Sequence, residues 1–215
     1  MIEVNDEHRL LAQSMKEKKA DMEMYREVEL PASAIIFVDL TMENVREAGY
    51  TPDELKDEEF PADKLHGLWP AAEFLETQWE LDDLKEGGYT PDEFHEGGWE
   101  AEALLEDNVF ELEELWEAGW PAENLREADF EAEQLREAGY TAEQMKEGGY
   151  AADELKDGGY TAEELKEAEF TPEEMKEGGW EAEELKEGGW AAEELIDVYG
   201  YDELHDAGYP ADEMK

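Results

Sequence analysis

The side chains that could perform acid–base or metal chemistry in this chain are its 64 Asp and Glu residues and its four histidines, since it contains no cysteine. His8, His66, His95 and His205 follow no Ser/His/Asp order and no zinc-ligand spacing, and neither a P-loop nor a G-x-G-x-x-G segment before a strand is present. A carboxyl group works as a general acid only where a desolvated pocket raises its pKa, and the carboxylates here stand in highly charged stretches. The sequence therefore indicates a protein that is not an enzyme, without catalytic residues or a cofactor.

Dense carboxylates also attract divalent cations, but a defined calcium site needs about six to eight oxygens held together. No D-x-[DN]-x-[DN]-G loop occurs in the chain. We therefore predict no metal ligands, and low-affinity, diffuse Ca²⁺ binding stays open as an alternative role.

One ten-residue pattern repeats from about residue 30 to the C-terminus, and YTAEELKEAE, which starts at Tyr160, is its clearest copy. Each copy begins with an aromatic residue at position 0; Leu30 and Leu40 are degenerate first copies, which makes about nineteen. The spacing is nine residues before Trp69 and Tyr199 and eleven before Phe110. The aromatic residues at position 0 are Tyr50, Phe60, Trp69, Trp79, Tyr89, Trp99, Phe110, Trp120, Phe130, Tyr140, Tyr150, Tyr160, Phe170, Trp180, Trp190, Tyr199 and Tyr209. A fixed period of this kind indicates a repeat array.

Each copy carries the start and stop signals of one short helix. Thr161 and Glu164 form the S/T-x-x-E pattern of a capping box, in which both side chains bond to otherwise free backbone N–H groups. Pairs such as Gly148-Gly149 allow a left-handed residue to end the helix. All eight prolines stand at position 1 or 2, where the N–H groups of a helix lack partners anyway.

The inward face is formed by positions 0, 2 and 5. Position 5 is apolar in every copy, as in Leu155 and Leu165, and position 2 is mostly Ala or Pro. Positions 3, 4, 6 and 7 hold mostly Glu, Asp, Lys or Gln and are expected to face water. Because isolated helices shorter than about twelve residues are marginal, the repeats must stack. The predicted fold is all-α, a solenoid of short capped helices stabilised by contacts between neighbouring repeats.

The two ends of the chain differ from this pattern. Residues 1–29 are predicted to form an N-terminal helical cap, with one longer helix over residues 7–28. Residues 30–215 form the decapeptide-repeat solenoid, and its first copies, 30–49, are degenerate and apolar.

The charge of the repeats restricts the class of partner. The chain carries −47 in total; residues 1–29 hold eight acidic and five basic residues, a net −3, so residues 30–215 carry −44. Such a surface repels nucleic acid and anionic lipid. We therefore expect a basic protein surface as the partner, such as a DNA- or RNA-binding protein, with no direct nucleic acid and no membrane.

The density of this charge can be compared with that of DNA. If two to three repeats make one turn of the solenoid, with a rise of about 9–10 Å per turn, one negative charge falls every ~1.4–2 Å. Duplex DNA has one per ~1.7 Å of axis. If the repeats instead stack one per layer, the spacing grows to about 4 Å and the likeness weakens.

At this level of detail the chain resembles the decapeptide-repeat proteins of the form A-G-[YF]-[ST]-A-x-x-L-K-x. The segment Glu137-Ala138-Gly139-Tyr140-Thr141-Ala142-Glu143-Gln144-Met145-Lys146 matches this form with Met in place of Leu. The resemblance implies a repeat scaffold and no catalytic residues. This sequence contains more Trp and more Glu than the simple pattern.

Two functions remain in competition. The leading hypothesis is a non-enzymatic binding protein, a rigid acidic solenoid that engages a basic, nucleic-acid-binding protein as a DNA mimic. The alternative is a structural or scaffolding repeat protein whose acidity serves solubility. In either case the chain is expected to be monomeric or to self-associate weakly through one end.

The candidate partner-binding residues are two aromatic residues outside position 0 and eight glutamates at positions 3 and 4. Phe37 lies in the apolar first repeats, and Trp116 occupies the Lys position of its repeat, where an exposed indole in an acidic surface is a plausible anchor. Packing at the irregular spacing before Phe110 is the other interpretation of Trp116. The glutamates are Glu143, Glu154, Glu163, Glu164, Glu173, Glu174, Glu183 and Glu184.

The sequence also bears on location. The absence of cysteine fits a reducing compartment. The N-terminal residues lack the layout of a signal peptide, and no apolar run approaches the ~18 residues of a membrane span. These features predict a cytoplasmic protein.

Overall fold

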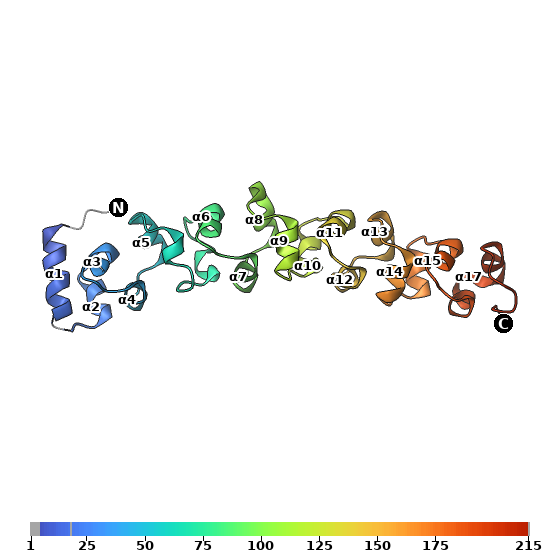
Figure 1. Cartoon of the computed structure of the whole chain (residues 1–215), viewed down its shortest axis with the longest axis horizontal. Coiled ribbons are helices and arrows are strands. Elements are labelled where there is room, and N and C mark those ends of the chain that lie inside the picture. Colours follow the sequence, from blue (N-terminus) through green and yellow to red (C-terminus); the bar gives the residue numbers. More distant parts are fainter. Residues whose placement is uncertain (1–4, 18, 215) are drawn as a thin grey trace. The chain divides into compact units, whose positions relative to one another are not determined.

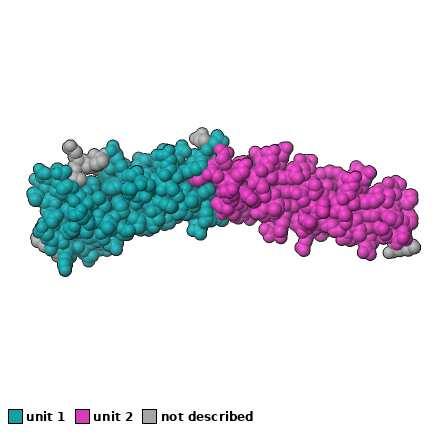
Figure 2. Space-filling model, viewed as in Figure 1, with its two compact units in different colours: residues 1–109 teal, residues 110–215 magenta. Residues whose placement is uncertain are grey.

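The computed structural model describes residues 5–17 and 19–214, without the side chain of Asp107. Within these ranges every regular element is a helix, and no strand occurs. The chain divides into two units, unit 1 (residues 1–109) and unit 2 (residues 110–215), which Figure 2 shows in different colours. In both units each helix packs mainly against helices one or two places away in the chain, which confirms the predicted all-α solenoid.

Unit 1 contains most of the irregular copies of the repeat (Figure 1). In its described part, α-helices alternate with three short 3₁₀ helices, labelled η1–η3. In chain order they are α1 (Asp6–Glu17), α2 (Met22–Glu27), α3 (Ala32–Phe37), α4 (Met42–Glu47), α5 (Pro52–Asp57), η1 (Ala62–Lys64), η2 (Ala71–Phe74), α6 (Leu81–Glu86), α7 (Pro91–Glu96), α8 (Ala101–Leu105) and η3 (Glu106–Asn108).

Unit 2 contains the regular copies, and its helices follow one another in chain order (Figure 1). They are α9 (Leu112–Glu117), α10 (Ala122–Glu127), α11 (Ala132–Ala138), α12 (Ala142–Glu147), α13 (Ala152–Asp157), α14 (Ala162–Glu167), α15 (Pro172–Glu177), α16 (Ala182–Glu187) and α17 (Ala192–Asp206). Gly200, with φ 80° and ψ 165°, interrupts α17 and divides it into two helical segments.

The predicted helix is confirmed in the regular repeats, and the predicted cap is confirmed where Thr precedes the helix. In α14 the N–H of Glu164 donates to Thr161 Oγ1 at 3.2 Å, and the N–H of Thr161 donates to Glu164 Oε2 at 2.7 Å. The helix runs from position 2 to position 7, so it contains six residues in most copies. Such a helix has few internal hydrogen bonds, and contacts with other repeats must stabilise it.

The paired glycines serve two different purposes, which Gly148 and Gly149 illustrate. Gly149 has φ +79° and forms the left-handed turn that ends α12. Gly148 has an ordinary αR-like backbone, but a Cβ there would lie 2.7 Å from the Cβ of Ala122. The first glycine therefore permits close packing between repeats, and the second permits the turn.

Stacking in unit 2 joins residues about two to three repeats apart. Tyr160 Oη donates to the carbonyl of Tyr140, 20 residues earlier, at 2.7 Å. Trp180 Nε1 donates to the carbonyl of Ala152, 28 residues earlier, at 3.0 Å. The aromatic residue at position 0 thus adds a directed hydrogen bond to its buried ring and fixes the relative placement of stacked repeats.

The core lies along the predicted inward face. Leu155 and Leu165, at position 5, are fully buried, and the aromatic residues Tyr150 and Tyr160 at position 0 are nearly so. Each buried leucine removes enough apolar surface from water to contribute about 1.5–3 kcal/mol. The core is therefore a continuous row of Leu and aromatic side chains within each unit.

Three departures from the spacing change the local structure. The nine-residue spacing before Trp69 coincides with the 3₁₀ helices η1 and η2, and the one before Tyr199 coincides with the interruption at Gly200. The eleven-residue spacing before Phe110 is taken up by η3 and by Asn108, whose φ is +56°.

The predicted single helix over residues 7–28 is wrong. α1 ends at Glu17, Lys19 has φ +54°, and α2 starts at Met22 after the N-cap Asp21. Tyr25 in α2 is fully buried at position 5, so residues 20–29 have the geometry of a further repeat. The sequence signal for this break is Asp21, an N-cap residue directly before the apolar Met22. In the structure this helix start prevails over the rough apolar face that predicted one continuous helix. The predicted boundary between cap and solenoid at residues 29 and 30 stays a prediction.

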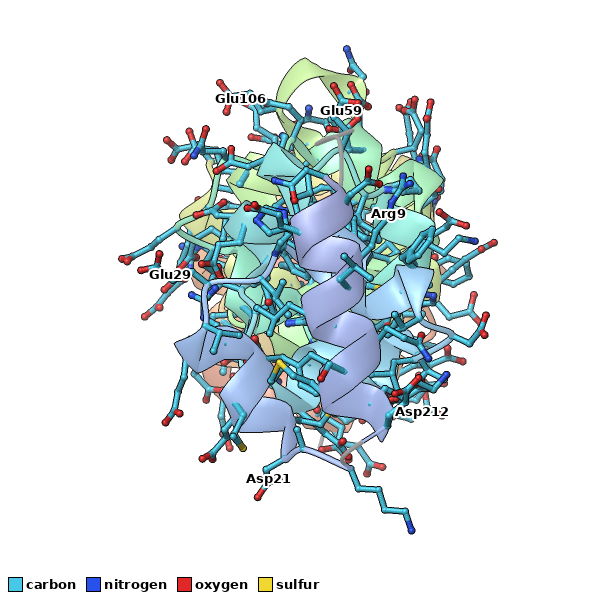
Figure 3. The ribbon with its side chains drawn as sticks, turned by 90° about the vertical axis from the view of Figure 1, so that its left-hand side faces the viewer. Arg9, Asp21, Glu29, Glu59, Glu106 and Asp212 are labelled. Atoms are coloured by element: carbon cyan, nitrogen blue, oxygen red, sulfur yellow. The ribbon has the colours of Figure 1, made fainter. Side chains whose placement is uncertain are left out.

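Figure 3 views unit 1 from its N-terminal end, where α1 lies against α3. The labelled Glu29, Glu59 and Glu106 stand at the periphery of this view. No helix in the described ranges has the length and apolar character required to cross a bilayer.

Candidate interaction surface

Position 4 of the repeat is engaged within the protein. Glu184 Oε2 accepts the N–H of Glu181 at 2.7 Å, and the same oxygen lies 2.7 Å from Lys156 Nζ. Partial burial raises the pKa of Glu184, but these two contacts outweigh it and leave its pKa below the ordinary value. The carboxylate at position 4 therefore caps its own helix and bonds to a repeat three copies earlier.

Position 6 supplies the other half of this bond. Lys156 Nζ donates to the carbonyl of Gly179 at 2.8 Å, lies 5.0 Å from the ring centre of Trp180, and reaches Glu184. It thus satisfies a carbonyl at a helix end, adds a cation–π contact and forms an ion pair. The expectation that position 6 only faces water is wrong, because the long Lys side chain lies along the next layer of the solenoid.

The link between positions 6 and 4 recurs in both units, each time between residues nearly three repeats apart. We call these pairs the register pairs. They are Arg26–Glu54, Arg46–Glu73, Lys56–Asp83 and His66–Glu93 in unit 1, and Arg126–Glu154, Arg136–Glu164, Lys146–Glu174, Lys156–Glu184, Lys166–Glu194 and Lys176–Glu203 in unit 2.

The residue types at the two ends of the register pairs change together. Ile36, Leu75 and Trp116 are apolar residues at position 6. The residues 28 positions after them, at the spacing of the Lys156–Glu184 pair, are Lys64, Ala103 and Gln144, and none of these is a carboxylate. Lys16 is an exception, since Asn44 stands at the place of its carboxylate partner and its ammonium lies 4.0 Å from Asp39 instead. Leu105 departs from the pattern too, since Glu133 stands at this spacing from it. In most stacked repeats the charges at positions 4 and 6 are therefore matched to each other.

Two further glutamates show the same electrostatic effect. The N–H of Thr171, with help from Lys146, lowers the pKa of Glu174. The hydrogen bond from Lys166 lowers the pKa of Glu194. Both carboxylates are therefore stabilised in the charged form by contacts inside the solenoid.

Positions 3 and 7 form a different surface, which we call the outer stripe. In the nine copies of unit 2 that start at Phe110 to Trp190, both positions are acidic and exposed. The residues are Glu113, Glu117, Glu123, Glu127, Glu133, Glu137, Glu143, Glu147, Asp153, Asp157, Glu163, Glu167, Glu173, Glu177, Glu183, Glu187, Glu193 and Asp197. In the part of unit 2 that the structure describes, none of them forms a salt bridge.

The outer stripe carries an electrostatic penalty within each repeat. Positions 3 and 7 are i and i+4 on one helix face, where like charges destabilise by about 0.2–0.5 kcal/mol. Position 7 is also the last residue of most of the helices, and a carboxylate there opposes the helix dipole by roughly 0.3–1 kcal/mol at low salt. A Lys or Gln at position 7 would be more stable, so folding does not explain the acidity of the stripe.

The structure separates the predicted partner-binding glutamates into two groups. Glu143, Glu163, Glu173 and Glu183, at position 3, lie in the outer stripe. Glu154, Glu164, Glu174 and Glu184, at position 4, belong to the register pairs. The sequence interpretation left out position 7, although its helical spacing of four residues from position 3 was a signal for it.

The two predicted aromatic anchors are partly exposed. Phe37, at the end of α3, is 54% exposed, and the guanidinium of Arg9 lies 4.6 Å from its ring centre. Trp116, in α9, is 37% exposed, and its indole lies against Gly139. Phe37 in unit 1 therefore lies beside the cation of Arg9. Trp116 in unit 2 occupies position 6, where other repeats have a Lys or an Arg.

The histidines take part in the repeat geometry. His66, at position 6, approaches Glu93 at 3.0 Å and packs edge-on against Tyr89, so it replaces the usual Lys. His205 lies 3.8 Å from Asp206. Within residues 5–17 and 19–214, no group of three or more His, Asp or Glu side chains is arranged to hold a metal ion.

Comparison with known families agrees with this architecture. The family model for the decapeptide repeat region matches residues 105–157 and 149–215, which together span just over half of the chain. No curated protein and no solved structure matches the chain.

Proposed function

Because the chain belongs to the decapeptide-repeat family, whose match describes a repeat and no reaction, we propose that it is a non-enzymatic binding protein. In this proposal the outer stripe of unit 2 engages a basic surface of a nucleic-acid-binding protein and acts as a DNA mimic. Unit 2 holds 34 acidic and eight basic residues, a net −26, so its partner must be cationic.

The observation that carries the proposal is the regular, unpaired outer stripe. Its carboxylates recur in pairs in every helix of unit 2, although each pair lowers the stability of its own helix. A partner with Lys or Arg side chains would remove that repulsion on binding. Long-range attraction between such surfaces also accelerates association, strongly so at low salt.

The stacking distance along the chain supports the comparison with DNA. Contacts between stacked repeats join residues 20 and 28 positions apart, as in Tyr160–Tyr140 and Lys156–Glu184. These separations correspond to two to three repeats per turn of the solenoid. In that case one negative charge falls every ~1.4–2 Å along it, as in duplex DNA. The register pairs hold the spacing of the stripe constant, which a disordered acidic chain could not do.

The register pairs themselves are excluded from the proposed binding surface. Glu154 and Glu184 are bonded to Arg126 and Lys156, and a partner would have to break these bonds to reach them. The proposal therefore assigns recognition to positions 3 and 7 and cohesion of the solenoid to positions 4 and 6.

The second candidate function is a structural scaffold, and the register pairs favour it. They show that charge is used to hold repeats in place, which a spacer needs as much as a binding protein does. Under this alternative the outer stripe only keeps the protein soluble, since net charge far from zero opposes association.

A competition experiment separates the two functions. The probe is a basic region–leucine zipper domain bound to a fluorescent DNA duplex, and displacement of the DNA is followed by anisotropy. The parent protein should displace the DNA, and displacement should weaken sharply between about 50 and 200 mM salt, as contacts with polyelectrolytes do.

The matched variant changes positions 3 and 7 to Gln or Asn over residues 140–189 and leaves positions 4 and 6 intact. It should fold with equal or higher thermal stability and lose the competition. Poly-L-glutamate at equal carboxylate concentration tests whether the ordered spacing matters. If the polymer or the neutralised variant competes as well as the parent, the DNA-mimic proposal fails and the scaffold function is favoured.

A further inference from the structure

Trp116 stands at position 6 of the first repeat of unit 2, directly before a series of cations. The following copies of position 6 are Arg126, Arg136 and a run of lysines, and each of them places its charge over an aromatic ring, as Arg126 does at 5.3 Å from Tyr150. Trp116 occupies the same place in α9. Its indole carbons lie 3.2–3.3 Å from where a Cβ of Gly139 would be, as Arg126 Nη1 lies 2.9 Å from that of Gly149.

The residues around Trp116 are adapted to the absence of a cation. Gln144 stands where a carboxylate would complete a register pair with position 116. Across the described part of unit 2, no cation lies over the ring of Tyr140, although one lies over Tyr150 and Tyr160. The layer that starts at Tyr140 thus lacks the internal positive charge that the layers at Tyr150 and Tyr160 have.

A groove and unpaired carboxylates lie beside this place. Gly139, which Trp116 contacts, lines a groove of about 760 Å³ together with Tyr140, Arg136, Glu137 and Glu143, while Trp116 itself lies outside this lining. Glu113 and Glu117, one turn before and one residue after Trp116, belong to the outer stripe. The partly exposed indole therefore stands in a negative surface, beside a groove that has room for another side chain.

We infer that Trp116 is the anchor of the binding surface and receives an arginine side chain of the basic partner. This inference rests on the proposed function. A guanidinium stacks flat on an indole and bonds in a forked manner to neighbouring carboxylates, whereas an ammonium does neither as well. The partner would thereby supply the cation that the repeat itself supplies at Arg126 and Arg136.

The test uses arginine-only and lysine-only peptides of about eight residues as probes, with the full chain. The main variant is Trp116→Leu, which keeps the net charge and introduces a residue that the chain already places at position 6 in Leu75. Its affinity for the arginine peptide should fall by about two- to fivefold, the effect expected of a partly exposed cation–π contact, while that for the lysine peptide should change less. Trp116→Tyr should retain most of the preference.

A direct readout supports the affinity measurements. The indole N–H resonance of Trp116, assigned by its loss in Trp116→Leu, should shift when the arginine peptide is added. Thermal unfolding of both variants should confirm that they are folded. Equal affinities of the parent and Trp116→Leu for the arginine peptide, or equal losses for both peptides, would overturn the anchor.

The outcomes distinguish the anchor from the proposed function. If the parent binds both peptides and Trp116→Leu binds them equally well, the anchor fails and the charged surface stands. If binding of the arginine peptide depends on Trp116 but does not respond to salt, the anchor stands and the electrostatic mechanism fails. If the parent binds neither peptide, both proposals fail.

Discussion

Lys156 and Glu184 belong to repeats three copies apart, and their Nζ and Oε2 atoms are 2.7 Å apart. The same ammonium donates to the carbonyl of Gly179, so one side chain joins α13 to the end of α15 and the start of α16. This link holds a short helix in place with respect to repeats that are distant in the sequence.

We expect Lys156→Met to destabilise the protein by about 1 kcal/mol, because the Gly179 carbonyl loses its donor and Glu184 loses its ion pair. Glu184→Gln should cost less, since Gln keeps an acceptor for the N–H of Glu181. A double-mutant cycle in urea should give a coupling of roughly 0.2–1 kcal/mol, the range for partly exposed pairs. A coupling of zero would show that Lys156 acts through the carbonyl and the Trp180 ring alone.

Leu155→Ala should destabilise the protein by about 2–5 kcal/mol, because the fully buried side chain leaves a cavity in the core. Glu154→Ala should also destabilise, since Glu154 accepts the N–H of Ala151 and pairs with Arg126. The control is Asp153→Ala in the outer stripe. Chemical denaturation measures all three, and a neutral Glu154→Ala would contradict the role given to position 4.

Glu187→Lys should raise the stability, by about 0.5–1 kcal/mol at low salt. It places a cation at the C-terminus of α16 and creates a favourable i, i+4 pair with Glu183. The gain should shrink in high salt, since both residues are exposed. Thermal unfolding at two salt concentrations is the measurement, and a decrease at low salt would mean that Glu187 has a structural partner.

Glu58 caps a helix from a distant repeat, and its removal should be costly. Its carboxylate is buried and accepts the N–H groups of Ala32 and Ser33, at 2.7 and 2.9 Å, and the Ser33 hydroxyl. The N-cap of α3 is Pro31, which offers no side-chain acceptor. Glu58→Ala should cost about 1.5–3 kcal/mol, whereas the exposed neighbour Asp57→Ala should have a smaller effect. Equal small effects would show that water replaces the carboxylate.

The buried tyrosines should make the solenoid sensitive to alkali. Burial raises the pKa of Tyr150 and of Tyr160 from 10.0 to about 12, because the phenolate would lose solvation inside the stack. A raised pKa in the folded state means that the stabilising contribution is complete below pH 10 and is lost as the pH rises through about 12. Circular dichroism against pH should show this loss.

The control for the alkaline transition is Tyr160→Phe. It should be less stable at neutral pH, since the Tyr140 carbonyl loses its donor, but its stability should fall less between pH 10 and 12. An unchanged alkaline transition would assign the effect to other groups.

The local structure of the repeat could be predicted from the sequence because its causes are local. The capping box of Thr161 and Glu164, the turn at Gly149 and the buried face at Leu155 each depend on residues within one ten-residue copy. The negative charge of the surface is likewise a property of composition. Such features follow from helix geometry and from the separation of apolar and charged side chains.

The roles of positions 4 and 6 were decided by the tertiary structure. Within one repeat, Glu184 and Lys186 both read as solvated residues, because nothing local shows that their partners lie two or three repeats away. Stacking brings Lys156 to Glu184, makes Gly148 necessary against Ala122 and leaves Trp116 at a place that other repeats give to a cation. A periodic sequence determines the unit, but the number of residues between stacked units depends on how side chains of successive layers fit. That fit determines which carboxylates hold the solenoid together and which remain free on its surface.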